Sequence, residues 1–249
     1  NELYNKSNMD FTKIAVMVDY KNRKEDLAKI ESIDLIRVAF HMEDYIEALK
    51  YCKYLKDIGY KVSANAMITS RYSEKEIKEL ASLSTKYRID YLYIADSLGN
   101  ISLNNIDRIN HLLTMNYDGK IGFHGHDNSG RALLNMEYLL SKNKDIIIDS
   151  CINGMGRGAG NLKTENLLIH LRQNHQYKIS VESIISILIL IDIEKAVYIL
   201  TALINVHPNY GSLILEKNLS LEKGYSILKL LKGKDKYVFD RESFNKYVT

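Results

Sequence analysis

Short apolar runs alternate with amphipathic segments along the first two thirds of the chain. Six of the runs predict strands, and the segments between them carry apolar residues at helical spacing. Strand–helix alternation of this kind indicates repeated βαβ units and a parallel sheet. Most of the runs are apolar without alternation, which predicts strands covered on both faces. The predicted strands span residues 14–18, 35–39, 61–67, 91–95, 120–124 and 146–150, and the clearest helices residues 44–58, 74–87, 104–113 and 131–141.

The pattern changes at about residue 180, after which Ile, Leu and charged residues recur at helical spacing to the end. This predicts an all-helical C-terminal extension, broken at His207-Pro208-Asn209-Tyr210. We therefore expect an α/β domain over residues 1–178 and a helical extension over residues 179–249. The apolar extension is expected to cover a barrel face or to form a homodimer, because exposed apolar surface of that size is unusual on a monomer.

Six strands are two fewer than a closed (β/α)₈ TIM barrel needs. An open doubly wound sheet accommodates six, but the residues after the first predicted strand, 18–22, contain no glycine and so lack its phosphate-binding fingerprint. The chain also opens with a polar segment, residues 1–10, and no Met. We expect a TIM barrel from which the first two βα units, about 60 residues, are missing in this chain.

The composition of the chain limits the classes of protein to which it can belong. At 249 residues with 46% apolar content, the chain can bury a large core. A net charge of +3 without long blocks of one sign does not favour nucleic-acid or membrane binding. Cys52 and Cys151 form no CxxC pair, the sequence shows no signal-peptide pattern, and the longest apolar run, 184–191, is too short to span a bilayer. These features predict a soluble, cytoplasmic protein.

Two histidines lie two residues apart at the end of the fifth predicted strand. Because successive strand side chains point to opposite faces, His124 and His126 share one face and can bind one metal ion. An isolated pair of this kind is more often structural, but a glycine-rich loop after the next strand favours a site, since parallel α/β proteins bind ligands at the carboxyl ends of their strands. Asp127 and Asn128 either fix an imidazole tautomer or cap the next helix.

The glycine-rich loop spans residues 153–161. Its glycines permit positive φ and allow backbone N–H groups to approach an anion, and Arg157 adds positive charge. We predict that Gly156, Arg157, Gly158 and Asn161 bind substrate. The alternative is a tight strand-to-helix connection without a ligand.

Three further polar residues in or directly after predicted strands are candidate catalytic groups. His41 follows a predicted strand, and an imidazole suits proton transfer near neutral pH, unless it is a solvent-facing loop residue. Arg37 lies inside a predicted strand and needs a partner, either Asp96 or a substrate carboxylate. Asp96 either orients an active-site water or a metal-bound histidine, or accepts hydrogen bonds within a turn.

Five motifs occur in order at the predicted strand ends: RVAFHMED at 37–44, NAMITS at 65–70, DSLGN at 96–100, HGH at 124–126, and GMGRGAGNLKTE at 154–165. This order resembles the HMG-CoA-lyase-like TIM-barrel metalloenzymes, and within them the 4-hydroxy-2-oxovalerate aldolase branch. The matching family patterns are RVATHxTEAD, LMMSH, DSxG, HxH and GxGxGAGNxxxE. The resemblance covers residues 14 to about 170.

The resemblance implies a metal-dependent aldolase that cleaves a 4-hydroxy-2-oxo acid through a metal-stabilised pyruvate enolate. His124 and His126 would bind Mn²⁺ or Mg²⁺ together with an Asp from the family's first strand, although the same ligand set also suits Fe²⁺ or Zn²⁺. Classical aldolases of this kind pair with an aldehyde dehydrogenase. The family's first-strand motif D-x-T-L-R-D-G, which supplies that Asp and an enolate-stabilising Arg, does not occur in this sequence.

Two other functions stay open. An acyl-CoA-dependent Claisen synthase of the same superfamily would usually carry a long regulatory domain, for which the C-terminal residues are few. A non-catalytic barrel that acts as an assembly or regulatory partner would be favoured by the missing motif if the native protein started at residue 1. For both the aldolase and the Claisen synthase, the expected substrate is a small molecule.

Overall fold

The computed structural model describes residues 13–24, 28–174 and 177–248. They group into two compact units. The first unit comprises the described residues up to Ser150 together with Gly156–Leu162, and the second comprises Cys151–Met155 and the residues from Lys163 onward. This division falls earlier than the predicted boundary after residue 178, because helix α5 (Thr164–Asn174) contacts the turn at Ile152–Gly154 and helix α6 (Val181–Leu188). The predicted polar segment 1–10 lies outside the described residues.

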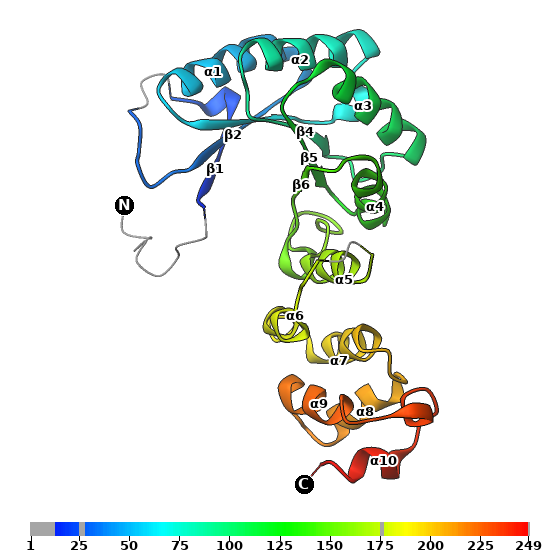
Figure 1. Cartoon of the computed structure of the whole chain (residues 1–249). Coiled ribbons are helices and arrows are strands. Elements are labelled where there is room, and N and C mark those ends of the chain that lie inside the picture. Colours follow the sequence, from blue (N-terminus) through cyan, green and yellow to red (C-terminus); the bar gives the residue numbers. More distant parts are fainter. Residues whose placement is uncertain (1–12, 25–27, 175–176, 249) are drawn as a thin grey trace. The chain divides into compact units, whose positions relative to one another are not determined.

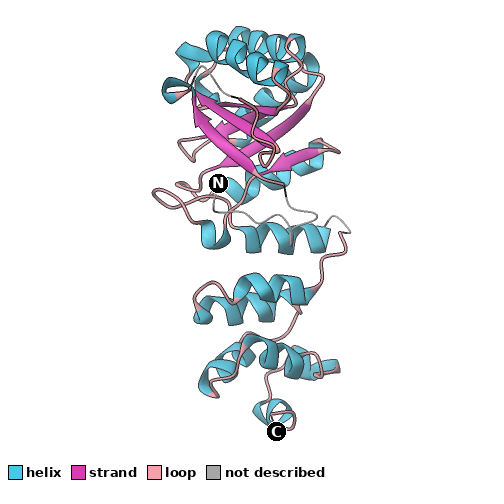
Figure 2. Ribbon diagram, turned by 90° about the vertical axis from the view of Figure 1, so that its left-hand side faces the viewer, coloured by secondary structure: helices cyan, strands magenta, loops and turns pink. Residues whose placement is uncertain are grey.

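The first unit is built on a parallel sheet whose six strands lie in sequence order (Figures 1 and 2). Each strand pairs in parallel with the next one along the chain, so the carboxyl ends of all six meet at one edge. This confirms the TIM-barrel-like α/β fold. The strands are β1 (Ala15–Asp19), β2 (Leu35–Phe40), β3 (Lys61–Ala66), β4 (Tyr91–Asp96), β5 (Lys120–Gly125) and β6 (Ile146–Ile148).

A helix follows each of the four middle strands, and α1, α2 and α3 lie side by side over one face of the sheet (Figure 1). Local sequence sets where they begin: Ser73 and Glu76 form a capping box at the start of α2, and Ser102 caps α3. The helices are α1 (Tyr45–Asp57), α2 (Glu74–Lys86), α3 (Leu103–Asn116) and α4 (Ala132–Lys142). All four agree with the predicted helices to within three residues at each end.

The two faces of the sheet differ in polarity. Most positions that face the helices are apolar and buried, for example Ile36, Val38 and Phe40 on β2. The alternate positions on the inner face include the buried polar residues Ser63 and Asn65 on β3. Consecutive positions of β3 and β4 are nevertheless buried, which confirms the prediction that these strands are covered on both faces.

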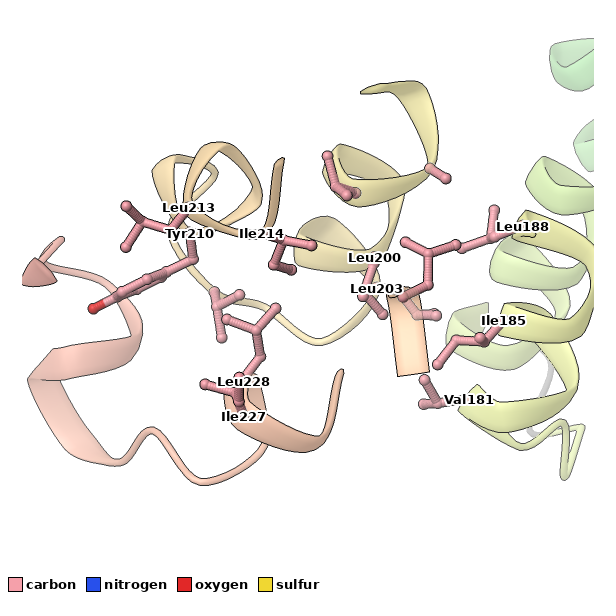
Figure 3. Close-up of a cluster of buried hydrophobic side chains, with 14 of the residues drawn as sticks. Val181, Ile185, Leu188, Leu200, Leu203, Tyr210, Leu213, Ile214, Ile227 and Leu228 are labelled. Carbon is pink, nitrogen blue, oxygen red and sulfur yellow. The ribbon is translucent and has the colours of Figure 1, made fainter. Parts of the chain in front are cut away.

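Apart from a bridge between Cys151 and Lys163, the regular elements among the described residues of the second unit are helices, and the predicted helical extension is confirmed. Helices α6 to α9 contribute the buried side chains of one core, which includes Tyr210 (Figure 3) and is joined by Phe244 near the C-terminus. The segment between α7 (Ile193–Leu203) and α8 (Asn209–Glu216) is residues 204–208, so the break predicted at 207–210 is found there, but its last two residues already belong to α8. Among the described residues every helix is too short or too polar to cross a membrane. The remaining elements are α9 (Leu221–Leu228), α10 (Arg241–Asn245) and the 3₁₀ turns Tyr20–Asn22, Met42–Asp44, Thr69–Arg71, Ile152–Gly154 and Gly233–Lys236.

Candidate active site

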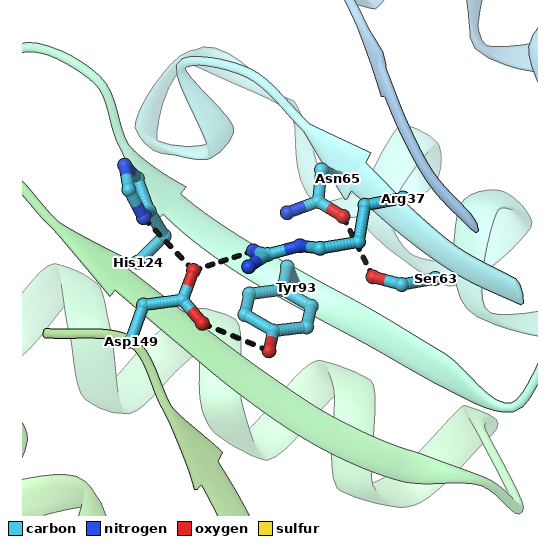
Figure 4. A network of polar contacts seen from close by, with 6 residues as sticks. All are labelled: Arg37, Ser63, Asn65, Tyr93, His124 and Asp149. Carbon is cyan, nitrogen blue, oxygen red and sulfur yellow. Dashed lines mark hydrogen bonds and ion pairs between the residues drawn. The ribbon is translucent and has the colours of Figure 1, made fainter. Parts of the chain in front are cut away.

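A network of polar side chains lies on the inner face of the sheet, centred on Asp149 just after β6 (Figure 4). His124 Nδ1 lies 2.9 Å from Asp149 Oδ2, and Arg37 Nη2 donates to the same oxygen. The hydroxyl of Tyr93 donates to Asp149 Oδ1 over 3.0 Å. Strands β2, β4 and β5 therefore contribute one residue each, and Asp149 directly follows β6.

Strand register brings these residues together. His124 on β5 lies next in register to Asp149, because Phe123 pairs with Ile148 and the Asp149 N–H donates to the Phe123 carbonyl over 3.0 Å. Arg37 lies on β2, three strands from β5, and extends across β3, with its guanidinium 4.4 Å from the centre of the Tyr93 ring (Figure 4). This stacking fixes the planar guanidinium over an aromatic face.

Charge on the inner face is compensated within the network. Burial raises the pKa of Asp149, but hydrogen bonds from His124 and Arg37 outweigh it and hold that pKa below its usual value. Burial and the neighbouring Asp149 carboxylate raise the pKa of Tyr93, so its phenol stays a hydrogen-bond donor. The Nε atom of Arg37 is buried and has no hydrogen-bond partner among the described residues.

His124 and His126 point to one side of the sheet, as their spacing predicts. Their ring centres lie 5.2 Å apart and the ring planes are inclined at 81°. Burial and the neighbouring His124 lower the pKa of His126, although Asp96 opposes the shift. Neutral imidazoles are the form that binds a metal ion, so the pair fits two positions of a divalent-metal site.

The part of the chain that the structure describes provides no third ligand beside the pair. Within residues 13–24, 28–174 and 177–248, no three His, Cys, Asp or Glu side chains are grouped so that they would bind one metal ion. The Asp149 carboxylate contacts the Nδ1 atom of His124, so it is placed to orient a metal-binding histidine and not to bind the metal itself. The described residues therefore fit part of a metal site.

The glycine-rich loop is joined to the end of β5 within the first unit. His126 and Asn161 form an antiparallel bridge, and the Asp127 N–H donates to the Gly160 carbonyl over 2.8 Å. The side chain of Asn128 adds a third connection, because its Oδ1 accepts from the Ala159 N–H at 3.0 Å. The loop and the histidine pair are thus held against each other by backbone contacts.

The four predicted substrate-binding residues all lie in this part of the loop. A Cβ on Gly156 would come within 2.5 Å of Asn161 Nδ2, and one on Gly158, where φ is +65°, within 2.5 Å of Asn128 Oδ1. These close approaches explain the glycines by packing alone, which is the tight-connection alternative. Arg157 is exposed. Substrate binding at Gly156, Arg157, Gly158 and Asn161 stays a prediction.

Asp96 closes a turn and does not pair with Arg37. It is the last residue of β4, is 1% exposed, and its two carboxylate oxygens each accept a backbone N–H, from Asn100 and Ile101, at 3.1 Å. The expected pairing with Arg37 was wrong because Asp96 occupies a helix-facing position of its strand, whereas Arg37 faces inward and meets Asp149.

The remaining candidates lie at the same carboxyl edge of the sheet. His41 directly follows β2, is half-buried, and precedes the turn at Met42–Asp44 without capping it through its side chain. Its predicted role in proton transfer stays a prediction. Asp127 Oδ1 accepts from the Ala132 N–H over 3.0 Å and thereby serves the start of α4, which is the capping alternative.

Two residues of the network, Asp149 and Tyr93, had no predicted role. A signal for Asp149 was present in the sequence, since a charged residue directly after the apolar run 146–148 resembles His124 at the end of the preceding strand. Tyr93 gave no comparable signal, because an aromatic residue inside a strand is typical of a core.

Comparison with known proteins places the chain in a family. The HMGL-like family model matches residues 36–197, which is more than half of the chain. The chain belongs to the HMGL-like family. Curated relatives include 4-hydroxy-2-oxovalerate aldolases of Geobacillus thermodenitrificans, 27% identical over 146 residues, and of Roseiflexus castenholzii, 30% identical over 146 residues. These matches cover 59% and 58% of this chain but only 42% and 43% of the relatives, so the HMGL-like chain spans about two fifths of their length.

Solved structures agree with this fold. The N-terminal domain of a putative aldolase from Bacteroides vulgatus matches with a TM-score of 0.67 and 26% identity, covering 88% of this HMGL-like chain and 69% of the other. An HMG-CoA lyase from Brucella melitensis matches with a TM-score of 0.53 and 13% identity, covering 62% and 64%. The second likeness supports the shared fold alone.

Proposed function

We propose that this HMGL-like protein is a divalent-metal-dependent carbon–carbon lyase acting on a 4-hydroxy-2-oxo acid. The observation that carries the proposal is the placement of His124 and His126 together on a polar inner face, at the carboxyl ends of a parallel sheet of this family. Relatives named 4-hydroxy-2-oxovalerate aldolase support the substrate class. The reaction would break the bond between C3 and C4 and release pyruvate and an aldehyde.

His124 and His126 would bind the metal ion, for which Mn²⁺ or Mg²⁺ is our proposal, together with a ligand from outside the described residues. When bound, the ion would polarise the carbonyl of the 2-oxo acid. Two contacts support the histidine pair: Asp149 holds His124, and the bridge to Asn161 holds the backbone of His126.

Other residues of the chain would act on the substrate. An imidazole nitrogen of His41, at the same edge of the sheet, would accept the proton of the 4-hydroxyl group. The exposed Arg157 would supply positive charge for the carboxylate of the acid. An aldehyde product would suit an aldehyde dehydrogenase as partner.

Metal binding tests the proposal directly. Mn²⁺ would be titrated into the 249-residue chain and followed by electron paramagnetic resonance, with His124→Ala and His126→Ala as variants. The exposed His111 on α3 provides a matched control, His111→Ala. We expect each site variant to weaken binding more than about tenfold and the control to leave it unchanged.

Release of pyruvate from 4-hydroxy-2-oxopentanoate, coupled to lactate dehydrogenase, tests the reaction. Activity that requires Mn²⁺ and is lost in both site variants would support the lyase. Equal, weak Mn²⁺ binding in all four proteins would contradict the metal site, and metal binding without pyruvate release would favour a non-catalytic role.

A further inference from the structure

Both oxygens of Asp149 are occupied by donors from neighbouring strands. Oδ1 accepts the hydroxyl of Tyr93, and Oδ2 is shared between Arg37 Nη2 and His124 Nδ1 (Figure 4). The side chain of Asp149 is 17% exposed and that of Arg37 16%, so little water competes for these contacts. The carboxylate is therefore held from several sides.

The direction of these hydrogen bonds determines where the proton of His124 lies. An arginine N–H can only donate, and the tyrosine hydroxyl donates to the other oxygen, so Asp149 acts as an acceptor at both of its oxygens. In the contact between Asp149 Oδ2 and His124 Nδ1, the hydrogen must therefore be on the imidazole nitrogen, which donates. This places the proton of a neutral His124 on Nδ1 and leaves the lone pair on Nε2.

We propose that Asp149 is a positioning residue, which holds His124 in one orientation and in the Nδ1–H tautomer so that Nε2 is its ligand nitrogen. The statement about Nε2 as a ligand rests on the proposed function, whereas the tautomer and orientation do not. Carboxylates that accept from the second nitrogen of a metal-binding histidine commonly set its tautomer in this way.

The same geometry gives Arg37 a supporting role instead of the predicted catalytic one. Its guanidinium is committed to the Asp149 carboxylate and stacked on the Tyr93 ring at 4.4 Å. Arg37 thus holds the Asp149 carboxylate in place, and that carboxylate in turn orients the imidazole of His124. Tyr93 acts on the other carboxylate oxygen and is not in the direct path to the imidazole.

Nitrogen NMR of the whole chain tests the inference without metal. Histidine labelled with ¹⁵N gives seven side-chain patterns in a long-range ¹H–¹⁵N correlation spectrum, and His124→Gln identifies the one that belongs to His124. We expect the Nδ1–H pattern in the wild-type protein at a pH where the ring is neutral. An Nε2–H pattern in the wild type would overturn the proposal even if no other variant folds.

Two variants separate a positioning role from general support of the fold. Asp149→Ala should release the ring to the tautomer mixture of a free imidazole and weaken Mn²⁺ binding about 10–100-fold. Tyr93→Phe, which removes the bond to Oδ1 but keeps the contact through Oδ2, should retain the Nδ1–H form. If Asp149→Ala does not fold, Asp149→Asn replaces it and should show a reduced share of the Nδ1–H form.

The outcomes distinguish the inference from the proposed function. A fixed Nδ1–H tautomer that is lost in Asp149→Ala, with no Mn²⁺ binding to any of the proteins, would keep the positioning role and contradict the metal site. A tautomer that is the same with and without the carboxylate would overturn the positioning role, whatever the metal does.

Discussion

Arg37 and Asp149 form an ion pair in which both side chains are largely buried, with 16% and 17% exposed. Replacing Arg37 by Met keeps an unbranched stem that still covers the Tyr93 ring, but it leaves the carboxylate without its cation. We expect Arg37→Met to destabilise the first unit, because an uncompensated charge then stays out of water.

The size of the effect follows from burial. An exposed ion pair contributes about 0.2–1 kcal/mol, whereas removing one partner of a buried pair costs about 3–5 kcal/mol. Asp149 keeps its hydrogen bonds to Tyr93 and His124, so we expect the lower end, about 3 kcal/mol. The double change Arg37→Met with Asp149→Leu should cost less than the sum of the single changes, because no buried charge remains.

Hydrogen exchange measured by mass spectrometry suits this test, because it reports the opening of the first unit by itself. Amides of β5 should exchange roughly 150-fold faster in Arg37→Met. Lys53→Met is the matched control: Lys53 pairs with Asp57 on α1, with 47% and 61% of their side chains exposed, and its loss should cost below about 0.5 kcal/mol. If Arg37→Met and the control differ by less than about 0.5 kcal/mol, the burial argument is refuted.

Three further predictions concern stability. Burial opposes ionisation of Asp149, but its partners hold its pKa below the usual value. The ionised carboxylate should therefore stabilise the fold fully above about pH 4, and this contribution should be lost as pH falls through the lowered pKa. In Asp149→Asn, the free energy of urea unfolding should depend less on pH between about pH 5 and 2 than in the wild type. Gly224→Ala would place a Cβ 2.6 Å from Ile214 Cδ1, so it should lower the free energy of unfolding by about 1 kcal/mol, unless Ile214→Val accompanies it. Ser73→Ala should cost about 1 kcal/mol in urea unfolding and Ser73→Thr much less, whereas equal losses would contradict the capping box with Glu76.

Much of the fold could be predicted because its signals are local. Apolar runs and helical periodicity located all six strands of the sheet and the helices between them, and Ser73 marked the start of α2. The pair His124 and His126 could be placed on one face from strand alternation alone. Such features depend on residues a few positions apart.

The partner of Arg37 could not be predicted from local signals, since two carboxylates were available at strand ends. Asp96 lies three residues after Tyr93 on the same strand, so alternation turns it to the opposite face from the Tyr93 ring. Asp149 continues the register of β6 beside His124. Parallel strands are joined by long crossovers, so no short turn fixes that register in the sequence.

Register also explains why a motif search finds the histidine pair but not the residue that supports it. His124 and His126 form a pattern because they are two positions apart, whereas His124 and Asp149 are 25 residues apart and become neighbours only through the pairing of Phe123 with Ile148. A one-residue shift of β6 would turn the carboxylate toward the helices and separate it from the imidazole, Arg37 and Tyr93 at once. The contacts of Asp149 with His124, Arg37 and Tyr93 therefore all depend on the pairing of β5 with β6.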